Sequence, residues 1–85
     1  MSRRRSDADI LASEYVTIGE LARITGIRYS TLKYYTEIGL ICFEQEEARL
    51  TRRYNQKATL LRLEQIKTQK EKGKSIEEIQ SKFQK

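Results

Sequence analysis

Residues 17–37 read TIGELARITGIRYSTLKYYTE, and this stretch predicts two short helices joined at a corner. Thr17 and Glu20 form a Thr-x-x-Glu capping box, in which each side chain accepts the backbone N–H of the other residue, so the first helix is expected to begin at Ile18. Gly26 stands at the corner, where the chain needs either a positive φ or a very close approach of the helices. Two helices joined steeply by a short turn with glycine form a helix-turn-helix.

The two faces of the second predicted helix differ in chemistry. Leu32 and Tyr35 lie three residues apart on the inward face. A glycine corner with apolar flanks is equally typical of a plain structural corner, so the outward face is what favours DNA binding. That face carries basic and hydrogen-bonding side chains of the kind that reach base edges and phosphates, namely Arg28, Tyr29, Ser30, Lys33 and Tyr34.

The composition is that of one small globular domain with a basic balance. The chain has 85 residues, of which 38% are hydrophobic and 34% charged, which suffices for one modest core. Its net charge of +5 favours a polyanionic partner. No apolar run has the length of a membrane span or the character of a signal peptide. One cysteine cannot form an internal disulfide, so a reducing cytoplasm is the expected compartment.

Patterns for catalysis and metal binding are missing from the sequence. The chain has no histidine, so neither a Cys/His pair nor a His-containing zinc site can form, and it has no phosphate-binding glycine loop. We therefore predict a protein without enzymatic activity, cofactor or metal. Cys42 falls in an expected strand, where a small buried apolar residue is favoured over a redox or metal role.

The chain divides into a short N-terminal part and one domain. Residues 1–14 are expected to form a flexible tail, and residues 15–85 the folded domain. The tail is neutral overall, and Arg3–Arg5 are either a basic arm for a phosphate or a minor groove or, as we favour, part of a frayed terminus. Ile10 and Leu11 are apolar and could hold a short turn against the core.

A two-stranded hairpin is predicted over residues 40–54. Gly39 ends the second helix as a C-terminal cap. Leu40–Phe43 is a β-rich apolar run, and Leu50–Tyr54 alternates as a partner strand would. Between them, Glu44–Arg49 has an ordinary length for a hairpin loop.

Two more helices are predicted after the hairpin. Asn55 is the N-cap of a helix that runs to Lys72 with an apolar stripe, and Gly73 stops it. Ser75 and Glu78 form a second capping box that opens a short fourth helix. A lysine cluster near this turn is either a solvated helix C-terminus or a second phosphate contact, and the second interpretation assigns Lys72 and Lys74 to DNA. The cluster comprises Lys67, Lys70, Lys72 and Lys74.

Taken together, these blocks resemble the DNA-binding domain of the MerR family of bacterial transcription regulators. The resemblance implies a mainly α winged helix-turn-helix with four short helices and a small β-hairpin. In that fold the first two helices read DNA, the hairpin is the first wing, and the turn between helices three and four is the second. The resemblance covers residues 16–83 and is carried by TIGELARITGI (17–27), STLKYYTEIGLI (30–41), RRY (52–54), LLRLEQIK (60–67) and GKSIEEI (73–79).

The resemblance also implies roles for single residues. Lys33 stands where the family usually has an arginine before paired tyrosines, of which Tyr34 faces DNA and Tyr35 faces the core. Thr17 is placed to bring the backbone N–H groups of the first helix to a phosphate. Wing contacts with DNA are expected at Arg49, Arg52 and Arg53, with Tyr54 packing inward.

Some features depart from the family pattern. Thr36 replaces the usual acidic residue after the tyrosine pair, and no proline follows the Gly-Leu-Ile segment. The wing tip carries Glu44, Glu46 and Glu47, which would repel a phosphate backbone or face a neighbouring protein. The family's long dimerising helix and effector domain have no room in 85 residues, so ligand sensing is not expected. The chain is either a stand-alone DNA-binding protein or a fragment of a longer one, and the start at Met1 favours the former.

These patterns predict sequence-specific binding of double-stranded DNA by a small transcription regulator. One alternative is an accessory or architectural factor such as an excisionase-like recombination directionality factor, and another is a protein-interaction module that uses the acidic wing. Gly73 interrupts any heptad run, and the core needs the apolar residues Ile76, Ile79 and Phe83. We therefore predict a monomer in solution, with copies side by side on DNA through the acidic wing.

Overall fold

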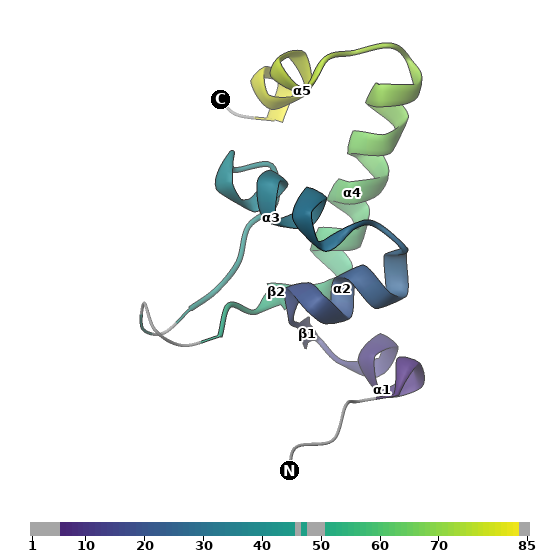
Figure 1. Ribbon diagram of the computed structural model, residues 1–85, viewed down its shortest axis with the longest axis vertical. Helices are drawn as coiled ribbons and strands as arrows, with labels where there is room; N and C mark the ends of the chain where they lie inside the picture. The colour runs from purple at the N-terminus through teal and green to yellow at the C-terminus, as the bar shows by residue number, and fades with distance from the viewer. Residues whose placement is uncertain (1–5, 46, 48–50, 84–85) are drawn as a thin grey trace.

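The computed structural model describes residues 6–45, 47 and 51–83. They form a mainly helical fold with a small two-stranded antiparallel sheet, as expected for a winged helix-turn-helix. Figure 1 shows α4 along the longest axis, α2 and α3 crossing beside it, and α5 turning back toward α3. The elements are α1 (Asp7–Ala12), β1 (Tyr15–Val16), α2 (Ile18–Thr25), α3 (Tyr29–Glu37), β2 (Tyr54–Asn55), α4 (Gln56–Glu71) and α5 (Ile76–Phe83).

The helix-turn-helix corner is formed as predicted. Thr17 Oγ1 accepts the N–H of Glu20 at 3.2 Å, and Glu20 Oε1 accepts the N–H of Thr17 at 2.9 Å, so α2 begins at Ile18. Gly26 ends α2 with a φ of 74°, and a Cβ added there would meet no atom within 4 Å. The positive φ, rather than a close approach of the helices, is therefore the reason for this glycine.

The inward face of α3 packs on a core to which every described helix contributes. Leu32 and Tyr35 are buried, as predicted. Gly39, with a φ of 81°, ends α3 in a Schellman arrangement, because the N–H of Leu40 donates to the carbonyl of Tyr35. The remaining buried apolar residues are Ile10, Val16, Leu21, Leu40, Ile41, Tyr54, Leu63, Ile66 and Ile79.

The N-terminal part differs from the predicted tail over residues 1–14. Asp7–Ala12 form α1, and Ile10 is fully buried in the core whereas Leu11 is 60% exposed. Of these two residues, Ile10 is the one that packs in the core, and it does so from a helix rather than from a turn. Arg3–Arg5 lie outside the described residues.

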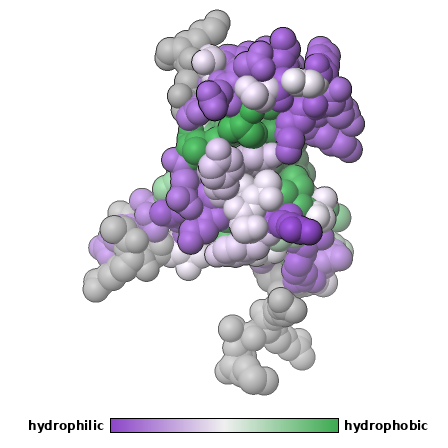
Figure 2. Space-filling view, turned by 45° about the horizontal axis from the view of Figure 1, so that its top comes forward, coloured by the Kyte–Doolittle hydropathy of each residue, from purple (hydrophilic) through white to green (hydrophobic). Residues whose placement is uncertain are grey.

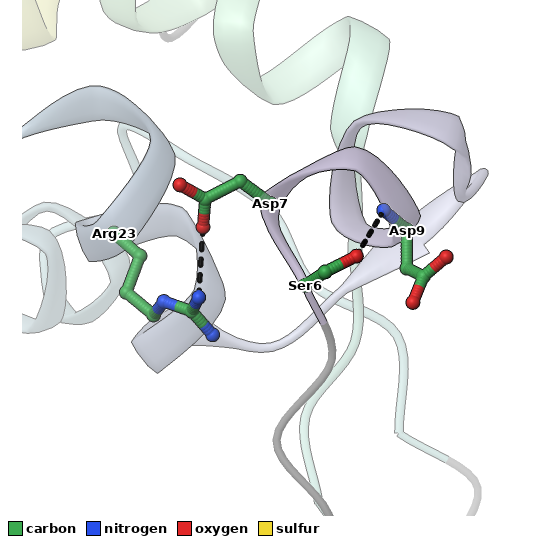
Figure 3. A network of polar contacts seen from close by, with 4 residues as sticks. All are labelled: Ser6, Asp7, Asp9 and Arg23. Atoms are coloured by element: carbon green, nitrogen blue, oxygen red, sulfur yellow. Dashed lines mark hydrogen bonds and ion pairs between the residues drawn. The ribbon is translucent and has the colours of Figure 1, made fainter.

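Side chains from α2 and α4 hold α1 in place. The Arg23 guanidinium donates to the carboxylate of Asp7 at 2.8 Å (Figure 3). The side-chain amide of Gln56, which is buried, donates to the carbonyl of Ile10 at 2.7 Å and to that of Ser13. The Ile10 carbonyl also accepts the backbone N–H of Ser13, so Gln56 adds a second hydrogen bond there and ties the C-terminal end of α1 to α4. The sequence pattern did not predict this helix, because the residues that hold it, Arg23 and Gln56, lie far along the chain.

In the first wing, fewer residues pair than in the hairpin predicted over residues 40–54. Leu40–Ile41 are buried and lie in the turn after α3 rather than in a strand. The described legs of the wing pair through one bridge, in which Glu44 and Arg53 exchange backbone hydrogen bonds of 2.7 and 2.9 Å. β2 pairs with β1 instead. The predicted pairing of Leu40–Phe43 with Leu50–Tyr54 was therefore wrong. β1 and β2 have only two residues each, which is too short to leave a periodic pattern in the sequence.

Cys42 is exposed, so the prediction of a small buried residue was wrong. The chain leaves the core directly after Ile41, which places the next side chain in solvent. Leu50, predicted to open the second strand, lies outside the described residues.

The two C-terminal helices are formed as predicted. Asn55 Oδ1 accepts the N–H of Ala58 at 2.9 Å at the start of α4. Ser75 and Glu78 form the second capping box, with hydrogen bonds of 3.0 and 3.2 Å. The backbone N–H of Ser75, helped by its hydroxyl, lowers the pKa of Glu78. The described residues thus contain five helices rather than four, and α1 is the additional one.

Candidate nucleic-acid interface

The outward face of α3 is exposed along its length. Tyr29 and Tyr34 are 54% and 47% exposed, whereas Tyr35, the next residue, is only 5% exposed. The other outward residues proposed from the sequence, Arg28, Ser30 and Lys33, are exposed as well. The helix therefore separates a buried apolar side from a solvent side of basic and hydrogen-bonding groups, as the spacing of its residues predicts.

One predicted phosphate contact lies beside the start of α2. Arg53 from the wing lines a hollow of about 340 Å³ with Thr17, Tyr15, Val16 and Glu20. The fold thus brings together Thr17 and Arg53, two predicted site residues from distant parts of the chain. The N–H groups of Thr17 and Glu20 are used by the capping box. An anion at this helix start would therefore meet the next two N–H groups, those of residues 18 and 19.

A lysine of α4 lies beside α3 on the other side. Lys70 lines a hollow of about 350 Å³ with Ser30, Thr31, Tyr34, Tyr35 and Ile76. The sequence places Lys70 within the lysine cluster but assigns Lys72 and Lys74 to DNA, and both of these are exposed in and after the turn. The packing of α4 against α3 decides which lysine borders the outward face of α3. The spacing of lysines along the chain therefore does not predict that it is Lys70.

The wing contributes two exposed arginines. The guanidinium carbon of Arg52 lies 4.5 Å from the centroid of the Phe43 ring. Arg53 is held through its backbone by the bridge to Glu44. Arg49, the third predicted wing contact, lies outside the described residues. Figure 2 shows hydrophilic residues over the α4–α5 end of the molecule and over the wing, on either side of a band of intermediate hydropathy.

Glu44 lies at the base of the wing, not at its tip as predicted. Its carboxylate accepts a hydrogen bond from the Tyr15 hydroxyl, and this bond, together with the negative charge of Glu44, raises the pKa of Tyr15 above its usual value. Glu44 therefore joins the wing to β1. Glu47 is exposed, and Glu46 lies outside the described residues.

Residues 16–85 match the family model of the MerR HTH family of regulatory proteins. The chain belongs to this family. No curated protein and no solved structure matches it. Membership makes the protein a DNA-binding helix-turn-helix regulator in general terms, and it agrees with the arrangement of α2, α3 and the wing.

The position that departs from the MerR pattern has a structural explanation. Thr36 is buried, its hydroxyl lies 2.9 Å from the carbonyl of Leu32, and it also lies 2.9 Å from the hydroxyl of Tyr54. Tyr54 is fully buried. A carboxylate here would have to be desolvated, whereas the threonine hydroxyl satisfies the tyrosine without a charge. The pair ties α3 to β2 and hence to the wing.

Among residues 6–45, 47 and 51–83 there is no group of acidic residues and cysteine that could hold a metal ion. No helix in this part of the chain is long and apolar enough to cross a membrane. A groove of about 740 Å³ lies between the α2–α3 corner and α4, with Ile24, Ile27 and Leu60 among its apolar lining.

Proposed function

We propose that this protein is a sequence-specific transcription regulator that binds double-stranded DNA in the cytoplasm, without catalytic activity or cofactor. The observation that carries the proposal is the exposed outward face of α3, which Lys70 borders, together with the exposed Arg53 of the wing beside the start of α2. A major groove about 12 Å wide admits one helix, and cations beside the helix then meet the phosphate backbones.

In this mode of binding, the residues divide by the part of DNA that they reach. Arg28, Tyr29 and Lys33 project from α3 toward base edges, where a bidentate contact is worth roughly 1–3 kcal/mol of discrimination. The remaining residues position the protein on the phosphates and carry no sequence information themselves. They are the start of α2 at Thr17, then Ser30, Tyr34, Arg49, Arg52, Arg53, Lys70, Lys72 and Lys74.

Selection from a randomised duplex library tests this proposal. The Arg28→Ala and Lys33→Ala proteins should lose base preference at single positions of the selected site. Arg53→Ala should weaken binding to all sequences and reduce the salt slope by about 0.9. Arg23→Ala is the matched control, because the Arg23 guanidinium pairs with Asp7 at 2.8 Å. This substitution should leave the base preference and the salt slope unchanged.

Other results of the selection would contradict the proposal in different ways. Unchanged site preference in both α3 variants would show that α3 does not read the bases. No enrichment of any sequence, with strong bending of the bound duplex, would indicate an architectural factor. No DNA binding by the wild-type protein would leave the wing as a protein-interaction surface.

We also propose that the free protein is a monomer. Ile79 of α5 is buried and Ile76 and Phe83 pack against the same core, which leaves no apolar stripe on this helix for a partner. Sedimentation should therefore give the chain mass of 10.0 kDa. A stable dimer would overturn this, and its loss in a Leu60→Glu protein would place the interface at the groove beside α4.

Specific binding by monomers requires several copies side by side on DNA. The wing and the α4–α5 turn project from different sides of the molecule (Figure 1), and they carry the exposed Glu47 and the lysine cluster respectively. We propose that these surfaces meet between neighbours, each exposed pair contributing about 0.2–1 kcal/mol. Glu47→Lys should reduce cooperativity on multi-site DNA without weakening single-site binding. A footprint confined to one inverted repeat would contradict this arrangement.

A further inference from the structure

Phe43 lies at the centre of a line of side chains that joins the wing to α3. The Arg52 guanidinium carbon lies 4.5 Å from its ring centroid. The ring of Phe43 also contacts that of Tyr54, with centroids 6.1 Å apart and an angle of 51° between the ring planes. Tyr54 is fully buried and its hydroxyl is bonded to Thr36 in α3. The line therefore runs from an exposed cation, through two aromatic rings, to the buried side of α3.

The contact with Phe43 restricts the side chain of Arg52, which the backbone of the wing alone would leave mobile. The described legs of the wing share one backbone bridge, and an exposed arginine on such a segment would lose considerable rotamer freedom on binding a phosphate. A ring face beneath a guanidinium attracts it electrostatically, because the ring face is negative. Phe43 is 36% exposed, so its ring lies at the surface, where the arginine can reach it.

We propose that Phe43 is a positioning residue for DNA binding, which holds the Arg52 guanidinium ready to contact a phosphate at a fixed offset from α3. The inference rests on the proposed DNA-binding function. It assigns a role to an exposed aromatic residue that base readout and core packing leave unexplained. Phe43 itself does not contact the DNA in this proposal; it acts through Arg52.

The test compares three substitutions at one position on the duplex selected in the library experiment. Phe43→Leu keeps an apolar side chain against Tyr54 but removes the ring, and it should weaken binding roughly 2- to 5-fold, the equivalent of one exposed cation–π contact. Phe43→Tyr keeps the ring and should bind as the wild type does. In the Arg52→Ala background, Phe43→Leu should cause no further loss, because the cation that the ring positions is gone.

A DNA-free measurement separates positioning from general destabilisation. The side-chain protons of Arg52 should show ring-current shifts in the free protein, which Phe43→Leu abolishes and Phe43→Tyr retains. Equal losses from Phe43→Leu in both backgrounds, or Arg52 shifts unaffected by Phe43→Leu, would overturn the inference while the DNA-binding proposal stands. Failure of the wild-type protein to bind any duplex would overturn the proposed function itself, and the inference with it.

Discussion

The helix-turn-helix corner and the first wing are stabilised in different ways. The corner is fixed by interactions between near neighbours, such as the Thr17–Glu20 capping box and the left-handed Gly26. The wing is fixed by groups from distant segments, since Glu44 bonds to the backbone of Arg53 and to the hydroxyl of Tyr15. The comparison shows that the proposed DNA-binding surface combines a helix that is encoded locally with a wing whose position depends on the whole fold.

The paired tyrosines of α3 give the largest expected contrast within the corner. Tyr35→Ala empties a site that is 5% exposed and should destabilise the protein by roughly 3–5 kcal/mol. Tyr34→Ala, at the neighbouring 47% exposed position, should change stability by less than about 0.5 kcal/mol while weakening DNA binding. Urea unfolding and DNA titration of both proteins measure the contrast. Equal stabilities would show that the helix is rotated from the orientation described.

The hydroxyl pair Thr36–Tyr54 tests how firmly the wing is tied to the corner. Thr36→Val leaves the buried Tyr54 hydroxyl without its partner and should cost about 1–3 kcal/mol. Adding Tyr54→Phe removes the hydroxyl that has lost its partner. The double variant should therefore lose less stability than the sum of the losses in the two single variants. Urea unfolding of the four proteins gives the coupling energy. Strict additivity would mean that the two hydroxyls do not interact in solution.

Two glycines test the local character of the corner. Gly26→Ala forces an L-residue to a φ of 74° and should cost roughly 1–2 kcal/mol, although its Cβ meets no atom within 4 Å. Gly19→Ala is the matched control inside α2, where the Cβ would lie 4.0 Å from Thr17 Oγ1, and it should stabilise by about 0.5–1 kcal/mol. Thermal unfolding distinguishes the two. A neutral Gly26→Ala would show that the turn relaxes to another conformation.

The contact between Tyr15 and Glu44 gives the smallest expected effect, and it depends on pH. Because the pKa of Tyr15 is raised in the folded protein, the unfolded chain loses this proton first, and the contribution of the contact falls as the pH rises above about 10. Urea midpoints should therefore decline less steeply with pH in Tyr15→Phe than in the wild type. Identical pH curves would show that the hydroxyl does not stabilise the wing.

Sequence patterns predicted the local features of the candidate site and missed the long-range ones. The caps at Thr17, Asn55 and Ser75 were confirmed because a capping residue and its partner lie within three positions of each other. By contrast, the helix at Asp7–Ala12 was missed, because the side chains that hold it against the fold, those of Arg23 and Gln56, belong to other helices. The position of Lys70 beside α3 likewise follows from helix packing rather than from spacing.

By itself, the sequence determined the corner, the inward and outward faces of α3 and the starts of α2, α4 and α5, because helical periodicity and capping act over three or four residues. Its resemblance to the MerR family indicated membership of a DNA-binding family. Only the tertiary structure decided that β2 pairs with β1, that Glu44 supports the base of the wing, and that Arg52 stacks on Phe43. These contacts join segments whose separation no local pattern records, and their formation requires the buried core that orders both partners at once.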